Sequence, residues 1–223
     1  DATWPPKQIQ WQNNNWKDEG IRADKVKDNG DFYAQTVKGV YKNYEELCQV
    51  DSLVDFAELL LRSYELINTN KSVKEFFHNR FKAILVDEFQ DTNTIQYNWL
   101  QEISSKSATI TTVGDDDQSI YGWRGAKVEN ISSFESSFKG AKVIRLEQNY
   151  RSTSVILSAA NALIDNNQER LGKNLWTDSL EGELITLYQA YDEQDEARFI
   201  AGIVKAWMEG GELYQDVGIV YRS

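Results

Sequence analysis

Two adjacent acids, Asp87 and Glu88, stand directly after the apolar run 84–86. An apolar run that ends abruptly in charge is typical of a buried strand of a parallel sheet. Ligands bind at the carboxyl edge of such a sheet, where carboxylates can hold Mg²⁺ and orient or deprotonate a water molecule. The pattern predicts Asp87 as a metal ligand and Glu88 as the group that activates water, although a strand that ends in solvated acids has the same pattern.

A second candidate site is a loop that carries two aromatic rings and a cation. Tyr121, Trp123 and Arg124 fall within four residues of one another, and Gly122 and Gly125 permit tight turns between them. Aromatic residues flanked by Gly and Arg on a loop have little regular face to bury. Every nucleobase offers a π-face to such a surface, so single-stranded nucleic acid is the natural ligand.

A third candidate is the pair Tyr150 and Arg151, which follows the strand-like run 143–146. Ser152 or Thr153 is placed to cap the helix that comes next. Arginine supplies positive charge to a transferring phosphoryl group, which gives Arg151 a possible role in phosphate chemistry. A helix start with a surface arginine explains the same residues.

The elements that position these residues alternate in type. Apolar and β-branched runs predict strands at 83–86, 109–113, 143–146, 184–188 and 217–221, and helical periodicity predicts helices at 53–64, 71–82, 93–103, 155–164 and 195–208. Strand, helix and strand with short connections favour an α/β fold with a parallel sheet and flanking helices. Residues 1–50 predict short amphipathic helices, broken at Pro5-Pro6 and Asn29-Gly30.

Composition limits the class of protein. The chain has 223 residues, of which 41% are apolar, enough for a core, and its net charge is -11. The acidic balance argues only weakly against nucleic acid, because a basic groove can be local. Cys48 is the single cysteine, which excludes an internal disulfide and a cysteine-based zinc site. No run reaches the length of a membrane span, so we expect no membrane partner and a cytoplasmic location.

Three segments together resemble a known family. They are 86–93, 113–126 and 146–152, which look like motifs II, III and IV of superfamily 1 DNA helicases, with the closest likeness to the UvrD/Rep/PcrA group. Segments 53–60, 195–199 and 219–223 resemble the same group, and its bacterial UvrD branch most of all. The resemblance covers essentially the whole chain and implies RecA-like motor lobes of the P-loop NTPase class.

The resemblance implies an ATP site with Mg²⁺. Asp87 would coordinate Mg²⁺, and Glu88 would polarise the water that attacks the γ-phosphate. Gln118 would contact the γ-phosphate and signal its presence to the DNA loop. Tyr150 would stack on adenine, and Arg151 would reach the γ-phosphate from the second motor domain.

The resemblance also implies a DNA groove and a biological role. Tyr121 and Trp123 would stack on bases of single-stranded DNA, Arg124 would support their loop, and Phe56 would add a base contact across the groove. The parent would be an ATP-dependent 3′–5′ helicase and translocase acting on single strands and single-strand/double-strand junctions. The family implies mismatch and nucleotide excision repair in the bacterial cytoplasm at the nucleoid, with MutL- and UvrB-like partners.

One departure from the family pattern concerns phosphate binding. The chain contains no Gly-x-x-x-x-Gly-Lys-Ser/Thr loop, which holds the β- and γ-phosphates in P-loop enzymes. We therefore expect an internal fragment, inactive alone, with the end of helical domain 1B at 1–50, the latter half of motor domain 1A at 51–147 and the start of motor domain 2A at 148–223. A helicase subunit of the RecB/AddA helicase–nuclease kind and a non-catalytic DNA-binding module remain alternatives.

Overall fold

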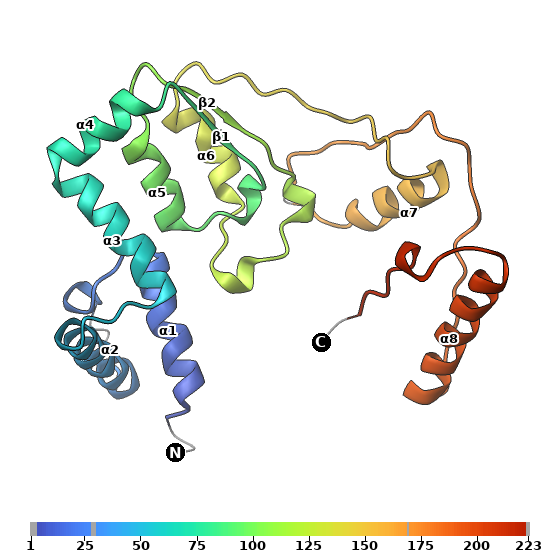
Figure 1. The fold of residues 1–223 in the computed structure, drawn as a ribbon, viewed down its shortest axis with the longest axis horizontal. Helices are drawn as coiled ribbons and strands as arrows, with labels where there is room; N and C mark the ends of the chain where they lie inside the picture. Colours follow the sequence, from blue (N-terminus) through green and yellow to red (C-terminus); the bar gives the residue numbers. More distant parts are fainter. Residues whose placement is uncertain (1–3, 28–29, 169, 222–223) are drawn as a thin grey trace. The chain divides into compact units, whose positions relative to one another are not determined.

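The structure, a computed structural model, describes residues 4–27, 30–168 and 170–221 (Figure 1). The chain divides into two compact units. The first consists of Asp1–Leu146 with Asn167–Lys173, and the second of Glu147–Asn166 with Asn174–Ser223. Among the described residues, no helix combines the length and apolar character needed to cross a membrane.

The first unit begins with two helices, α1 (Pro6–Asp18) and α2 (Phe32–Val50). Proline at the first position of α1 loses no hydrogen bond, because that N–H has no partner within a helix. The Asp31 side chain caps α2 by accepting hydrogen bonds from two backbone N–H groups. Helix α1 therefore begins at Pro5-Pro6, the first of the two predicted breaks. Asn29 of the second predicted break lies outside the described residues.

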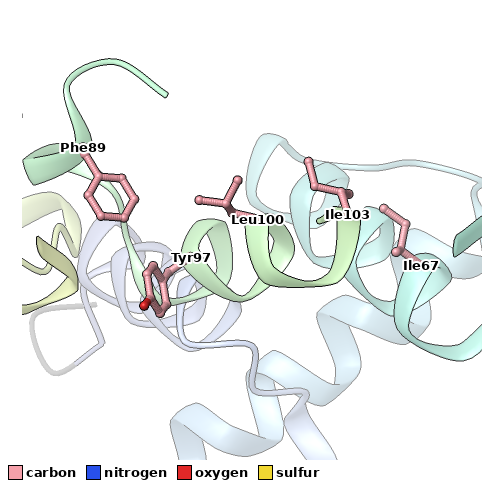
Figure 2. Packing of buried hydrophobic residues seen from close by; sticks show 5 residues of the cluster. All are labelled: Ile67, Phe89, Tyr97, Leu100 and Ile103. Atoms are coloured by element: carbon pink, nitrogen blue, oxygen red, sulfur yellow. The ribbon is translucent and has the colours of Figure 1, made fainter. Parts of the chain in front are cut away.

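Four helices form the body of the first unit: α3 (Phe56–Thr69), α4 (Lys71–Arg80), α5 (Thr94–Ile103) and α6 (Glu129–Ser137). Their shared core includes the buried side chains shown in Figure 2, which are Ile67, Phe89, Tyr97, Leu100 and Ile103. The core spans α3, α5 and the turn after the first strand, so it fixes the base on which the acid pair stands.

The sheet has two parallel strands, β1 (Ala83–Val86) and β2 (Thr109–Thr112), joined through α5. Ala83 pairs with Thr109 and Val86 with Thr112. Beyond the ladder, the Val113 N–H donates to the Val86 carbonyl oxygen at 2.8 Å. Figure 1 shows the two strands side by side, with α5 and α6 next to them. The predicted strand–helix–strand unit and its parallel direction are confirmed.

Three predicted strands are wrong. Residues 143–146, 184–188 and 217–221 form no β-ladder among the described residues. Their side chains are largely exposed, because no neighbouring strand satisfies their backbone groups or covers their apolar faces. An apolar run favours a β-strand, but the strand forms only where a neighbouring strand is available for pairing.

The second unit contains α7 (Ser154–Ile164) and α8 (Glu193–Glu209), close to the predicted helices. A parallel bridge between Gln148 and Trp176 ties its first turn to a later segment. Thr153 stands at the N-cap of α7, but its hydroxyl makes no capping bond and is buried without a hydrogen-bond partner. The predicted side-chain cap at this helix is therefore absent.

Candidate functional site

Asp87 and Glu88 lie where β1 ends, and both are exposed. The Glu88 N–H donates to the Asp87 carboxylate at 2.9 Å. Glu88 has a left-handed backbone conformation, with φ of 49° and ψ of 44°, which is uncommon for a residue with a Cβ and costs roughly 1 to 3 kcal/mol. The chain reverses direction here, so the two carboxylates stand at the carboxyl edge of the sheet.

Gln90 connects the acid pair to the loop after β2. Its side chain is 1% exposed. Its Nε2 donates to Glu88 Oε2 at 2.7 Å, and its Oε1 accepts from the Asp115 N–H at 3.0 Å. A Cβ on Gly114 would lie 3.0 Å from Gln90 Oε1, so glycine permits this close approach. Sequence reasoning missed Gln90, although a glutamine two residues after a strand-end acid was a usable signal.

Gln118 lies at the end of a short 3₁₀ turn that Asp115 begins. Asp115 accepts hydrogen bonds from the Asp117 N–H at 3.0 Å and from Gln118 Nε2 at 2.7 Å. Burial opposes the charge of Asp115, but hydrogen bonds from Lys173 and Gln118 outweigh it and lower the pKa of this carboxyl. Lys173 and Arg170 form ion pairs with this acidic turn, while Gln118 itself is exposed. Gln118 is therefore held in place and accessible to a ligand.

The aromatic loop has an exposed Trp123 and a half-buried Tyr121. The centroids of Tyr121 and Trp123 are 6.5 Å apart at an angle of 51°. The guanidinium carbon of Arg124 lies 5.0 Å from the Tyr121 ring centroid and 4.5 Å from that of Trp123. Trp123 is 62% exposed, and Gly125 closes the turn with φ of 83°. Arg124 therefore braces both rings from within the loop while leaving aromatic surface for a base.

Hydrogen bonds fasten this loop to the segment that follows the acids. The Lys127 N–H donates to the Thr92 carbonyl oxygen at 2.9 Å. The buried Asn130 donates through Nδ2 to the same carbonyl and to Thr92 Oγ1, each at 3.0 Å. Asn93 and Ala126 form an antiparallel bridge. The backbone that follows the acid pair is therefore bonded directly to the backbone that follows the aromatic loop.

The end of α1 meets the same stretch. Asn93 Nδ2 donates to Asp18 Oδ1 and Thr94 Oγ1 donates to Glu19 Oε2, both at 2.9 Å. Lys127 pairs with Glu19 at 3.0 Å. Burial, followed by the neighbouring charge of Glu19, raises the pKa of the Asp18 carboxyl to about 6. Among the groups around this site whose pKa is displaced from its ordinary value, Asp18 ionises closest to neutral pH.

Phe56 is the first residue of α3 and is 93% exposed. Its position depends on an ion cluster beneath it, where Lys17 contacts Asp55 at 2.7 Å and Glu58 at 3.0 Å. Burial opposes the charge of Glu58. Hydrogen bonds from Arg62, Arg22 and Lys17 outweigh burial and lower the pKa of this carboxyl to about 2. Asp55 also caps α3, because its carboxylate accepts a hydrogen bond from the Glu58 N–H at 2.7 Å. The cluster ties α1 to α3 and leaves the Phe56 ring facing solvent.

Tyr150 and Arg151 belong to the second unit. Tyr150 is 83% exposed, and its hydroxyl donates to Gln148 Oε1 at 2.7 Å. Asn149 Oδ1 accepts from the backbone N–H groups of Arg151 and Ser152, at 2.9 and 2.8 Å. The Asn149 side chain therefore shapes the turn, and both predicted residues present their side chains to solvent.

A parallel strand–helix–strand unit with an acid pair at its carboxyl edge occurs in nucleotide hydrolases of the P-loop class. Two family models match this chain. Residues 1–139 match the UvrD/REP helicase N-terminal domain, and residues 144–223 match the UvrD-like helicase C-terminal domain. The chain belongs to the UvrD/REP helicase family, which confirms the resemblance found in its motifs, and its α/β fold fits an incomplete RecA-like motor.

Curated relatives agree with the family models. The chain is 54% identical over 220 residues to DNA helicase II of Escherichia coli, which covers 99% of this chain and 31% of that protein. It is 49% identical over 223 residues to DNA helicase II of Haemophilus influenzae, covering 100% and 30%. It is 44% identical over 201 residues to ATP-dependent DNA helicase PcrA of Staphylococcus aureus, covering 90% and 28%. The chain thus spans about a third of the length of these relatives.

Proposed function

We propose that the whole protein is an ATP-dependent DNA helicase that moves along single-stranded DNA. The observation that carries this proposal is the set of contacts that joins residues 92–93, which follow the acid pair, to residues 126–130, which follow the aromatic loop. A site that would hydrolyse a nucleotide and a surface that would stack on bases are thereby connected within the first unit through a few hydrogen bonds. The relatives named DNA helicase II and ATP-dependent DNA helicase PcrA support the same function.

In this proposal Asp87 holds Mg²⁺ and Glu88 orients the attacking water. The fit is chemical: Mg²⁺ takes oxygen ligands and is commonly bound by one or two carboxylates together with substrate phosphates and water. Bound Mg²⁺ would neutralise charge on the phosphates. Gln118, exposed at the end of its turn, contributes an amide to the γ-phosphate. Tyr150 stacks on adenine and Arg151 supplies positive charge to the γ-phosphate.

The phosphate cradle is not among these 223 residues, since they contain no Gly-x-x-x-x-Gly-Lys-Ser/Thr loop. We infer that this chain alone neither hydrolyses ATP nor unwinds DNA. In domain terms it comprises the end of helical domain 1B at 1–50, part of motor domain 1A at 51–147 and part of motor domain 2A at 148–223.

On the DNA side, Tyr121 and Trp123 stack on bases, Arg124 braces their rings, and Phe56 adds a further aromatic contact. The exposure of Trp123 and Phe56 supports these roles, because a stacking residue must offer its face to the strand. Membership of the family supports 3′–5′ movement, a role in mismatch and nucleotide excision repair with MutL- and UvrB-like partners, and a place at the bacterial nucleoid.

The test is Glu88→Gln in the full-length protein, with Glu135→Gln on the exposed face of α6 as the matched control. Removal of the water-orienting carboxylate should lower DNA-stimulated ATP turnover by about 100-fold or more, because general acid–base groups contribute roughly 10²- to 10⁴-fold. Affinity for single-stranded DNA should stay within about twofold. Unchanged turnover with intact DNA binding would point to a binding module and contradict the proposal.

A further inference from the structure

We propose that Gln90 is a positioning residue that orients the Glu88 carboxylate and makes its orientation depend on the loop after β2. The proposal rests on the proposed function, in which Glu88 orients the attacking water. It assigns to Gln90 a part in ATP turnover that acts only through Glu88.

Both polar atoms of the Gln90 amide form hydrogen bonds. Its Nε2 donates to Glu88 Oε2 at 2.7 Å, while its Oε1 accepts from the Asp115 N–H at 3.0 Å. The side chain is 1% exposed, so water does not compete for either bond. A fully buried amide with both groups engaged has one orientation, and it imposes that orientation on an otherwise exposed carboxylate.

The backbone of Glu88 increases the need for such a contact. Its left-handed conformation, with φ of 49°, is sparsely populated and persists only where the surroundings enforce it. The bond from Gln90 occupies one acceptor site of Oε2, while Oε1 can accept a hydrogen bond from water. Gln90 therefore fixes the orientation in which the carboxylate meets the attacking water.

The other end of the amide is sensitive to the neighbouring loop. A Cβ on Gly114 would lie 3.0 Å from Gln90 Oε1 and 3.3 Å from the Gln90 backbone nitrogen, so the loop packs directly on this side chain. Asp115, whose N–H binds Gln90, also accepts a hydrogen bond from Gln118 through its carboxylate at 2.7 Å. A change at Gln118 reaches Glu88 through two residues, each joined to the next by a hydrogen bond.

The experiment compares Gln90→Met with the matched control Gln101→Met, an exposed position on α5, in the full-length protein. Methionine keeps the length of the side chain and removes both hydrogen bonds. We expect kcat for DNA-stimulated ATP hydrolysis to fall about 10- to 100-fold, the usual loss when a supporting partner of a reacting group is removed. The KM for ATP and the Kd for single-stranded DNA should change by less than about twofold. An unchanged kcat would overturn the proposal.

A double-mutant cycle separates positioning from general damage to the fold. In the Glu88→Gln background, measured under single-turnover conditions, Gln90→Met should change the rate by less than about twofold, because its target carboxylate is gone. The same fold-change in both backgrounds would show that Gln90 acts elsewhere and overturn the proposal. Where Gln90→Met does not fold, Gln90→Leu takes its place, since it is also an uncharged apolar side chain and likewise removes both hydrogen bonds.

Failure of this inference is distinguishable from failure of the proposed function. Glu88→Gln alone reports on the function. A large loss with Glu88→Gln and none with Gln90→Met removes the inference and keeps the helicase proposal. No loss with Glu88→Gln removes both.

Discussion

The strand pair in the first unit differs from the apolar runs of the second unit, although their sequence patterns are similar. The runs 83–86 and 109–113 of the first unit pair and form a parallel ladder. The equally apolar runs 184–188 and 217–221 of the second unit form no ladder among the described residues, and neither does 143–146, which belongs to the first unit but lies outside its strand–helix–strand segment. The difference shows that β-branched, apolar composition does not make a strand without a neighbour to pair with.

The cores differ in the same way. The first unit buries a continuous cluster around Leu100 and a second one around Tyr41. In the described part of the second unit, Leu157 is the one apolar side chain classed as buried. The candidate site residues are held differently in the two units. In the first unit, the buried side chains of Gln90 and Asn130 bond to the segments that carry the acids and the aromatic loop. In the second unit, a local turn at Asn149 positions Arg151.

The largest effect should come from the core of the first unit. Leu100→Ala in this 223-residue chain should lower the free energy of unfolding by about 2 to 5 kcal/mol, because it opens a cavity in the cluster of Figure 2. The matched change Leu184→Ala in the second unit, at a side chain that is 83% exposed, should cost less than about 0.5 kcal/mol. Urea denaturation measures both, and equal losses would erase the contrast between the units.

A smaller effect is expected for the aromatic loop. Trp123→Ala in the full-length protein should weaken binding of a single-stranded oligonucleotide by about 1 to 3 kcal/mol, roughly 5- to 150-fold, because one stacking platform is lost. Trp207→Ala, at an exposed tryptophan of α8 in the second unit, is the matched control and should change affinity by less than about twofold. Fluorescence anisotropy titrations measure both. Equal weakening by the two variants would show that the aromatic loop is not part of the DNA-binding surface.

The smallest effect concerns Asp18. Because its folded-state pKa of about 6 lies above the ordinary value of 3.8, its stabilising contribution is complete below about pH 4 and is lost as the pH rises through about 6. Asp18→Asn keeps an acceptor for Asn93 and never ionises, so it should be more stable than the parent chain at pH 8 and equal to it at pH 4. Asp18 is half-buried and partly screened by water, so we expect about 1 kcal/mol.

Urea midpoints at pH 4, 6 and 8 test the Asp18 prediction, with Asp216→Asn at an exposed position of the second unit as the control. A stability difference that is the same at all three pH values would show that Asp18 does not titrate in this range.

Much of the first unit could be predicted from local signals. Asp55 and Asn93 are residues that favour the N-cap, and both cap helices where the sequence predicted a start. The strands at 83–86 and 109–113 were predictable because their composition and the intervening helix agree with one another. Helix α6 was missed, because its nine residues are mostly polar and serine-rich and show no clear apolar period.

The hydrogen bonds that hold the site together could not be predicted from local signals. Gln90 and Asn130 are polar side chains whose roles depend on contacts with residues 25 and 38 positions away along the chain. Propensity and periodicity describe neighbours along the sequence, whereas these bonds appear only once β2 and α6 are packed. The motif spacing located the acids and rings, and the tertiary structure supplies the residues that hold them.

We propose that this chain carries the acids and the γ-phosphate-sensing side of a nucleotide site without its phosphate cradle. Calorimetric titration of Mg-ATP into the 223-residue chain tests it most directly, with circular dichroism beside it to establish that the chain is folded. The account predicts no saturable binding by the folded chain. Tight, saturable binding would contradict it, because these residues would then hold the phosphates by themselves.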